Sequence, residues 1–363
     1  MNILFITEFT PKKERDVFTG GVDARTSTTV RFLKNTHNVQ VINRSQHRIF
    51  ASTFSVFPRF LFQLQAFLQA FLIKADIIEG SNFVTYLPAW GSAKLKGIPA
   101  VAWFADVYGN VWFKHFAIFP AVTGWLLERV ALKLPWNQVI AMSNSTKRKL
   151  IEASIPEDKI TIIYGGVETE KLRKLQAQKY LRPTICTICR LVNYKRVNEL
   201  IMALANLKRD FPSCRLLVIG AGPQEMNLRN LTQTLQLERD VRFLGTLPHD
   251  ETMTILKRCH LLAMPSVVEG FGLVTVEAMA CGVPFVNSRI PATVEITKNG
   301  LGGLLFSPED VNDLEEKIRE LLTNKALYQQ KQKEGLKLAK QYDWAIIAKQ
   351  TEEVYRKAMG DRV

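Results

Sequence analysis

Two glutamates eight positions apart flank a turn with two glycines, in the segment Glu269-Gly-Phe-Gly-Leu-Val-Thr-Val-Glu277. A helix is expected from near Leu273, and the free N–H groups at its start, reinforced by the helix dipole, form an anion site. Gly270 and Gly272 let an anion approach the backbone closely. Glu277 falls about one turn inside the helix, where a carboxylate can accept two hydrogen bonds from a ribose diol. Glu269 comes before the turn. If the anion is a phosphate group, its carboxylate is free to face whatever is attached to that phosphate.

Two cations, Arg190 and Lys195, follow the predicted strand Thr184–Cys189. A cation pair at the carboxyl end of a strand suits two adjacent phosphates and a leaving group that gains negative charge. The alternative is a pair of solvated surface cations. The pair Gly20-Gly21 follows another predicted strand; two glycines can simply make a turn, and they lack the spacing of a dinucleotide fingerprint, so NAD binding is disfavoured.

These segments resemble, in their order, a large glycosyltransferase family (family 4, glycosyl transferases group 1) whose signature is Glu, seven residues, Glu. The matches cover nearly the whole chain. In chain order they are Tyr164-Gly-Gly-Val-Glu168, Arg190-Leu-Val-Asn-Tyr-Lys195, Ile219-Gly-Ala-Gly-Pro223, Val241-Arg-Phe-Leu-Gly245, Leu304–Leu314 and the pair Asp343-Trp344. The resemblance implies a retaining glycosyltransferase, with a nucleotide diphosphate sugar as donor. It also implies GT-B architecture, in which two Rossmann-like, doubly wound parallel-sheet domains face a central cleft.

The resemblance further implies a role for each matched position. Arg190 and Lys195 should clamp the diphosphate of the donor, Glu277 should hold its ribose, and Glu269 should bind its sugar and take part in catalysis. The other donor contacts should come from turns and from the helix start, at Gly20, Gly21, Gly220, Gly222, Gly245, Phe271, Gly272, Leu273 and Val274.

Asp106 is the only acid between Gly80 and Leu127, and it follows the predicted strand Ala100–Phe104. Many members of the family place a histidine just before this aspartate, where this chain has Ala105. We expect Asp106 to orient the acceptor hydroxyl or to accept its proton. The alternative is a turn aspartate that satisfies backbone donors. His115 could substitute for the family's histidine in space, and its aromatic surroundings also suit an interfacial residue.

The elements that hold these residues can be read from the apolar pattern: short apolar runs alternate with amphipathic stretches along all 363 residues. This alternation is typical of an α/β fold with two parallel sheets, each covered by helices on both faces. We predict an acceptor-binding domain at residues 1–167, a donor-binding domain at residues 168–344, and a last helix at residues 345–363 that completes the first domain. The carboxyl ends of both sheets should border one cleft.

The chain carries a formal net charge of +14, and the stretch Ala24–Ala75 holds seven basic residues and no acid. Within it, Phe57–Lys74 is rich in phenylalanine, which is compatible with a helix packed on a sheet or with an interfacial helix among lipid headgroups. Residues 112–125 are a second candidate for an interfacial helix. No zinc-finger spacing, RNP-like motif or lysine-rich tail favours nucleic acid.

We therefore expect an anionic membrane surface as partner of the first domain, and a glycan or lipid-linked acceptor in cell-envelope polysaccharide, glycoprotein or glycolipid synthesis. With no signal-peptide pattern at the N-terminus, we expect the protein in the cytoplasm, as a peripheral protein on the inner face of the membrane. A soluble acceptor, a nucleotide-sugar epimerase and a phosphorylase are the alternatives, although no pyridoxal lysine for a phosphorylase is identifiable.

Neither a metal nor another cofactor is expected. The chain lacks an Asp-x-Asp motif, so that its own cations should neutralise the diphosphate. Cys186 and Cys189 have the spacing of a metal or redox pair, but they fall in a predicted strand where positions three apart face opposite sides.

Overall fold

The computed structural model describes residues 1–8, 21–44, 56–115 and 118–360, and it divides into two compact units. The first unit comprises Met1–Gly165 together with Trp344–Val363, and the second comprises Gly166–Asp343. Each unit is built on one parallel sheet with helices between its strands. The predicted α/β fold with two doubly wound parallel sheets is therefore confirmed.

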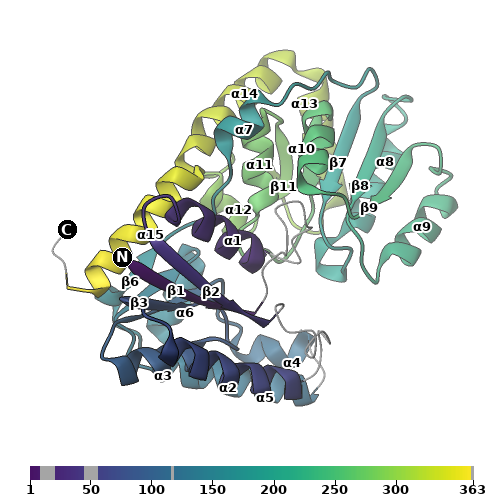
Figure 1. The fold of residues 1–363 in the computed structure, drawn as a ribbon. Coiled ribbons are helices and arrows are strands. Elements are labelled where there is room, and N and C mark those ends of the chain that lie inside the picture. Colours follow the sequence, from purple (N-terminus) through teal and green to yellow (C-terminus); the bar gives the residue numbers. More distant parts are fainter. Residues whose placement is uncertain (9–20, 45–55, 116–117, 361–363) are drawn as a thin grey trace. The chain divides into compact units, whose positions relative to one another are not determined.

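In the described part of the first unit, six strands form a parallel sheet in the order β2-β1-β3-β4-β5-β6 (Figure 1). The strands are β1 (Asn2–Thr7), β2 (Asn38–Asn43), β3 (Ile77–Gly80), β4 (Ala100–Phe104), β5 (Gln138–Ala141) and β6 (Ile160–Ile162). The α-helices are α1 (Gly21–Leu33), α2 (Val56–Leu72), α3 (Tyr86–Lys96), α4 (Trp112–His115), α5 (Ile118–Lys133), α6 (Asn144–Glu152) and α15 (Trp344–Ala358).

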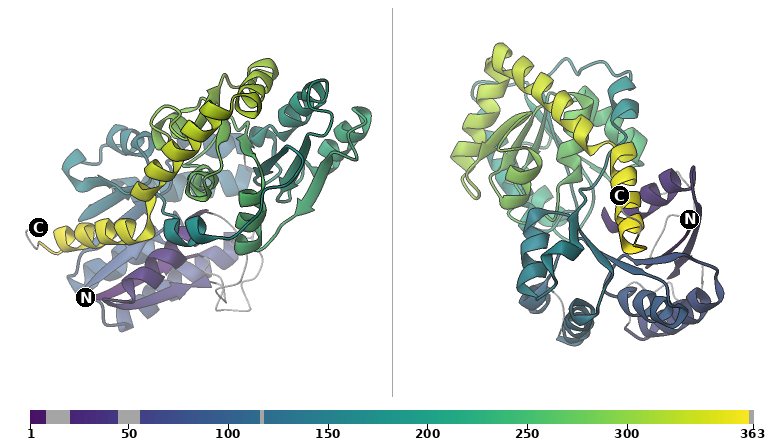
Figure 2. Two further views of the ribbon diagram at one scale, coloured as in Figure 1. Left: turned by 90° about the horizontal axis from the view of Figure 1, so that it is seen from above. Right: turned by 90° about the vertical axis from the view of Figure 1, so that its left-hand side faces the viewer.

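Helices cover both faces of this sheet because successive strand residues point to opposite sides. On one face, Leu4 and Ile78 belong to a buried core that also contains residues of α2, α3 and α5. On the other face, α1 packs against the C-terminal helix α15 (Figure 1 and Figure 2). The last helix is thus part of the first unit, although its residues come from the far end of the chain.

A buried charged cluster joins α1 and α15 to the sheet. The carboxylate of Glu79, in β3, forms an ion pair with Arg25 of α1. Its Oε2 also accepts a hydrogen bond of 2.6 Å from the Tyr355 hydroxyl of α15. The guanidinium of Arg25 lies 4.8 Å from the centre of the Trp103 ring. All of these side chains are almost completely buried, so each charge depends on the others for its partners.

Helix α2 is turned so that one phenylalanine and two alanines face inward. Phe62, Ala66 and Ala70 are buried in the core of the first unit. Large apolar side chains lie on its outer side, where Phe60 is 63% exposed; the others are Phe57, Leu64, Leu68, Phe71 and Leu72. None of the helices in the described ranges combines the length and the apolar character that crossing a bilayer requires.

In the described part of the second unit, six strands form a parallel sheet in the order β12-β11-β10-β7-β8-β9. The strands are β7 (Thr184–Ile188), β8 (Arg215–Ile219), β9 (Val241–Gly245), β10 (Leu261–Met264), β11 (Phe285–Ser288) and β12 (Gly303–Phe306). The α-helices are α7 (Thr169–Lys174), α8 (Val197–Leu207), α9 (Glu225–Thr234), α10 (His249–Arg258), α11 (Leu273–Cys281), α12 (Pro291–Ile296), α13 (Val311–Thr323) and α14 (Lys325–Ala339).

The strand order reverses between β7 and β10, which pair directly with each other. The chain after β7 continues to β8 on one side, and the chain after β10 continues to β11 on the other. The loops that follow these two strands therefore start side by side and diverge, which is where open parallel sheets bind their ligands.

Replacing Arg25 by Met should lower the free energy of unfolding by about 3–5 kcal/mol, because the buried Glu79 carboxylate loses its counter-ion. Arg356→Met is the matched control, since Arg356 makes an exposed ion pair with Glu352 worth about 0.5 kcal/mol or less. Urea denaturation measures both changes. Equal effects of the two substitutions would contradict the role given to the Glu79 cluster.

Candidate active site

The loops after β7 and β10 bring the predicted cation Lys195 and the predicted carboxylate Glu269 together. Nζ of Lys195 lies 2.5 Å from Oε1 of Glu269, and both side chains are largely buried. The N–H of Val267 donates a 2.9 Å hydrogen bond to the carbonyl of Tyr194, which ties the two loops to each other. Arg190 lies on the first loop with its side chain exposed. The reversal of strand order thus brings a cation and a carboxylate together from segments more than 70 residues apart.

Backbone hydrogen bonds join the loop after β7 to the loop after β8, and that loop to the end of β9. Leu191 donates to the carbonyl of Ala221 at 3.0 Å, and Gly220 donates to the carbonyl of Gly245 at 2.7 Å. Gly245 has a positive φ of 68°, in the left-handed region that favours glycine. These bonds hold the turn that carries Arg190 against the neighbouring turns.

Gly220 and Gly222 have a packing reason for being glycine. A Cβ on Gly220 would lie 1.9 Å from the carbonyl oxygen of Cys189, and one on Gly222 would lie 2.3 Å from that of Leu191. Gly220 also has a φ of 121°, which side chains rarely adopt. We predicted that these glycines let a nucleotide pass close to the backbone. In the structure, it is the loop after β7 that lies where their Cβ atoms would be. Contact of the two glycines with a nucleotide stays a prediction.

Burial makes Cys189 an unreactive thiol. Its pKa rises to about 11 because it is removed from water, although the nearby Lys195 acts in the opposite direction. Cys189 is half-buried, and Cys186 is fully buried. Neither sulfur is therefore a nucleophile near neutral pH.

The start of α11 presents backbone donors beside this cluster. Gly272 is its N-cap, with a positive φ of 88°, and within the described residues the N–H groups of Leu273 and Val274 form no hydrogen bond. Such groups, with the helix dipole, favour an anion. The ring of Phe271 is buried against Tyr342, so that its main chain is the part that can face a ligand. A donor contact at Phe271 stays a prediction.

Glu277 has a partner that the sequence did not reveal. Nε2 of His249, the first residue of α10, lies 2.7 Å from Oε1 of Glu277. Burial lowers the pKa of His249, but the hydrogen bond and charge of Glu277 outweigh it, so that the pKa lies above the usual value for histidine. A lone histidine 28 positions before a glutamate forms no recognisable motif.

Three buried polar atoms lie close to the same edge of the sheet. They are Oγ of Ser266 after β10, and Oδ1 of Asn287 and Oγ of Ser288 in β11, and they have no hydrogen-bond partner within the described residues. The other side of the Asn287 amide donates a 2.8 Å hydrogen bond to Oγ1 of Thr275 in α11. Buried polar groups are nearly always satisfied in folded proteins, so these atoms are further candidates for ligand contacts.

In the first unit, Asp106 follows β4 and is already engaged. Its Oδ1 accepts hydrogen bonds from the N–H of Val107 at 2.8 Å and from Nζ of Lys149 at 2.7 Å. The turn role that we considered as the alternative is therefore present, and the side chain remains about one-third exposed. A role of Asp106 toward an acceptor stays a prediction. Of the glycine pair, Gly20 lies outside the described residues and Gly21 is the first residue of α1.

The loop after Asp106 is held by a buried glutamate that sequence reasoning also missed. Glu128 of α5 accepts hydrogen bonds from the N–H groups of Tyr108 at 2.9 Å and Gly109 at 2.7 Å, and from the indole of Trp112 at 3.2 Å. Burial raises the pKa of Glu128, while the two backbone N–H groups act to lower it. The carboxylate fixes the course of the chain between β4 and the start of α4.

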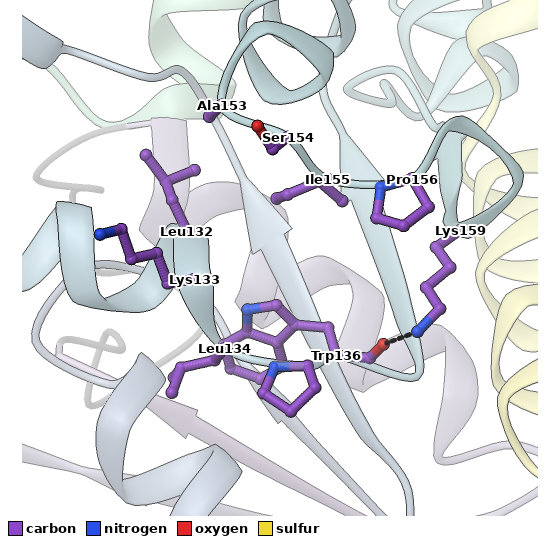
Figure 3. A pocket seen from close by; sticks show the side chains of 10 residues that line it. Leu132, Lys133, Leu134, Trp136, Ala153, Ser154, Ile155, Pro156 and Lys159 are labelled. Atoms are coloured by element: carbon purple, nitrogen blue, oxygen red, sulfur yellow. Dashed lines mark hydrogen bonds between the residues drawn. The ribbon is translucent and has the colours of Figure 1, made fainter.

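A surface pocket of about 370 Å³ lies elsewhere in the first unit (Figure 3). Its lining comes from the segments before β5 and β6, including Trp136, Ile155 and Lys159. These segments are at the amino ends of the strands, opposite to the edge where parallel sheets bind ligands. Within the described residues, no group of three His, Cys, Asp or Glu side chains is placed to hold a metal ion.

Known proteins resemble this chain over most of its length. A family model described as glycosyl transferases group 1 matches residues 168–338, and one described as glycosyltransferase family 4 matches residues 14–171. A glycogen synthase of Mycobacterium tuberculosis is 28% identical over 298 residues, which is 80% of this chain and 70% of the relative. The gpi3 subunit of phosphatidylinositol N-acetylglucosaminyltransferase from Schizosaccharomyces pombe is 25% identical over 60% of this chain and 48% of the relative.

Among solved structures, Anabaena HepE in complex with UDP-glucose is similar with a TM-score of 0.76. It is 19% identical, and the match covers 97% of this chain and 98% of HepE. A glycosyltransferase from Rickettsia africae is similar with a TM-score of 0.77 and 20% identity, over 99% of each chain. These similarities support the GT-B fold.

Gly220→Ala should lower the free energy of unfolding by about 2 kcal/mol or more, since the new methyl group would overlap the Cys189 carbonyl in a strained backbone conformation. Gly270→Ala is the control, because no atom lies within 4 Å of its Cβ position. Thermal unfolding compares the two variants. If Gly220→Ala is as stable as Gly270→Ala, the packing argument is wrong.

Proposed function

The chain belongs to the glycosyl transferases group 1 family, and we propose that it transfers a sugar from a nucleoside diphosphate sugar to a hydroxyl group of a glycan or lipid-linked acceptor, with retention of configuration at the anomeric carbon. The relative HepE, which forms complexes with UDP and UDP-glucose, supports a donor of this class. The transferred group is proposed to be a hexose.

The observation that carries the proposal is the gathering of Lys195, Glu269 and the first N–H groups of α11 where the strand order reverses. A diphosphate needs cations and N–H donors, and a sugar needs a carboxylate that accepts from its hydroxyl groups. Both kinds of group occur within one small region of the second unit. Arg190, exposed on the adjoining loop, adds a second cation.

The proposed reaction breaks the bond between the anomeric carbon and the phosphate oxygen and forms a bond to the acceptor oxygen on the same face. The acceptor proton passes to the departing phosphate, and Asp106 orients the acceptor hydroxyl. Arg190 and Lys195 stabilise the charge that grows on the diphosphate, which is the main electrostatic need of this step. With two protein cations in this role, we propose that the transfer needs no metal.

The outer surface of the first unit supports an acceptor at a membrane. Besides the exposed phenylalanines and leucines of α2, helix α5 exposes Ile118, Phe119, Val122 and Leu126. The guanidinium of Arg129 lies 4.4 Å from the Trp125 ring centre, next to this second stripe. Apolar side chains with neighbouring cations and few acids suit insertion among anionic headgroups. We therefore propose that the enzyme acts as a peripheral protein at the inner face of the cytoplasmic membrane.

Arg190→Gln should lower kcat/KM for sugar transfer by about 10²–10³-fold, because one cation on the leaving diphosphate is lost. The activity is first identified by incubating the protein with UDP- and GDP-sugars that carry a label in the sugar, and by following transfer of the label to a lipid-linked acceptor. Arg209→Gln, an exposed arginine on the same unit, is the control. Undiminished transfer by Arg190→Gln, or epimerised donor in place of transfer, would contradict the proposal.

Replacing Phe60 and Leu68 together by Ser should weaken binding to anionic vesicles by about 100-fold, since burying each such side chain contributes about 1.5–3 kcal/mol. Sedimentation with phosphatidylglycerol vesicles and with neutral phosphatidylcholine vesicles measures binding. The control replaces Leu181 and Met226, exposed apolar residues of the second unit, by Ser. Failure of the unaltered protein to bind either kind of vesicle would refute the membrane proposal.

A further inference from the structure

Glu277 shares one of its carboxylate oxygens with His249. The imidazole comes from the first turn of α10, which packs against α11, and its Nε2 lies 2.7 Å from Oε1 of Glu277. The two side chains differ in exposure, with 42% for His249 and 13% for Glu277. The carboxylate is therefore fixed from its solvent side by a residue of another helix.

A single hydrogen bond of this kind leaves Glu277 with enough acceptor capacity for a diol. A carboxylate offers about four lone-pair sites, of which His249 occupies one. Oε2 keeps both of its sites, and Oε1 keeps one. Two vicinal hydroxyl groups can therefore still donate to Glu277, but only if the plane of the carboxylate is held in the right orientation.

We propose that His249 is a positioning residue that orients the Glu277 carboxylate toward the two ribose hydroxyls of the donor nucleotide. The inference rests on the proposed function, because it needs a nucleotide at this site. It goes further by assigning a residue outside the signature segment to the recognition of the ribose. The contribution of His249 is thus specific to nucleotides that carry both hydroxyls.

The charges around His249 make this contribution dependent on pH. Glu277 on α11 and Asp250 on α10, with Nδ1 of His249 3.8 Å from Oδ1 of Asp250, favour the protonated ring, whereas Lys171 on α7 disfavours it. Because the pKa is raised, the charged pair is fully formed below the usual pKa of histidine and is lost as the pH rises through the raised value. Preference for a ribonucleotide should fall over the same range.

The test compares the binding of UDP and GDP with that of their 2′,3′-dideoxy counterparts, measured by calorimetry. For whichever base binds, His249→Phe should weaken ribonucleotide binding by about 10-fold, the loss expected for a hydrogen bond to a charged group. Binding of the dideoxynucleotide should stay unchanged. His249→Gln, whose amide can donate to Glu277, should recover part of the loss and remove the dependence on pH. Glu251→Gln, an exposed neighbour on α10, is the control.

The outcomes separate this inference from the function on which it rests. If the unaltered protein binds neither nucleoside diphosphate, the proposed function fails. If it binds one, and Glu277→Gln loses the preference for ribose while both His249 variants keep it, only the role of His249 is wrong. Equal losses for the ribonucleotide and the dideoxynucleotide would make His249 a purely structural residue and would also overturn the inference.

Discussion

The reversal of strand order between β7 and β10 is the constraint on which the candidate site depends. Right-handed connections carry the chain away from these two strands in opposite directions. The loops that follow them therefore diverge, as they do where open parallel sheets leave a crevice beyond the carboxyl ends of their strands. Hydrogen bonds such as that from Val267 to Tyr194, and the approach of Gly220 to Cys189, then join the loops along the edge of the sheet. Lys195 and the N–H donors of α11 are thus carried on loops that backbone contacts hold in place, as suits groups that must stabilise charge without reorganising.

Burial separates the carboxylates that hold the fold from those that face a ligand. Glu79 and Glu128 are almost fully buried, and each has several donors from the protein itself. Glu269 and Glu277 are partly exposed, and in each one carboxylate oxygen is held by one side chain, Lys195 or His249. A buried carboxylate needs all of its partners to offset desolvation, whereas a partly exposed one can exchange a partner for a hydroxyl group of a substrate.

The sequence allowed the fold class and much of the second unit's site to be predicted, because these follow from local order. Alternating apolar runs predict parallel strands, and a glycine turn before a helix predicts a candidate anion site within one short segment. His249 and Glu128 were missed because their partners lie on other helices or loops, and nothing in a single sequence records which side chains meet there. The same limit applies to Gly220, whose neighbour Cys189 is remote in the chain.

Helix α2 packs on the core with one face, as one of our two interpretations of its sequence predicted, and the other interpretation, an interfacial helix, concerns its opposite face. Its narrow inner face lets it lie close to α3, where Ser92 donates a 3.0 Å hydrogen bond to the carbonyl of Phe67 and Gly91 leaves room for the Phe67 ring. Phe62 reaches the core, but most of the large apolar side chains of the helix lie outside it, Phe60 among them. A helix on the surface of a water-soluble unit usually has its large apolar side chains inside and polar ones outside, because contact of apolar surface with water is unfavourable. The core therefore accounts for the alanines of α2 but not for its outer phenylalanines, which suit an apolar partner.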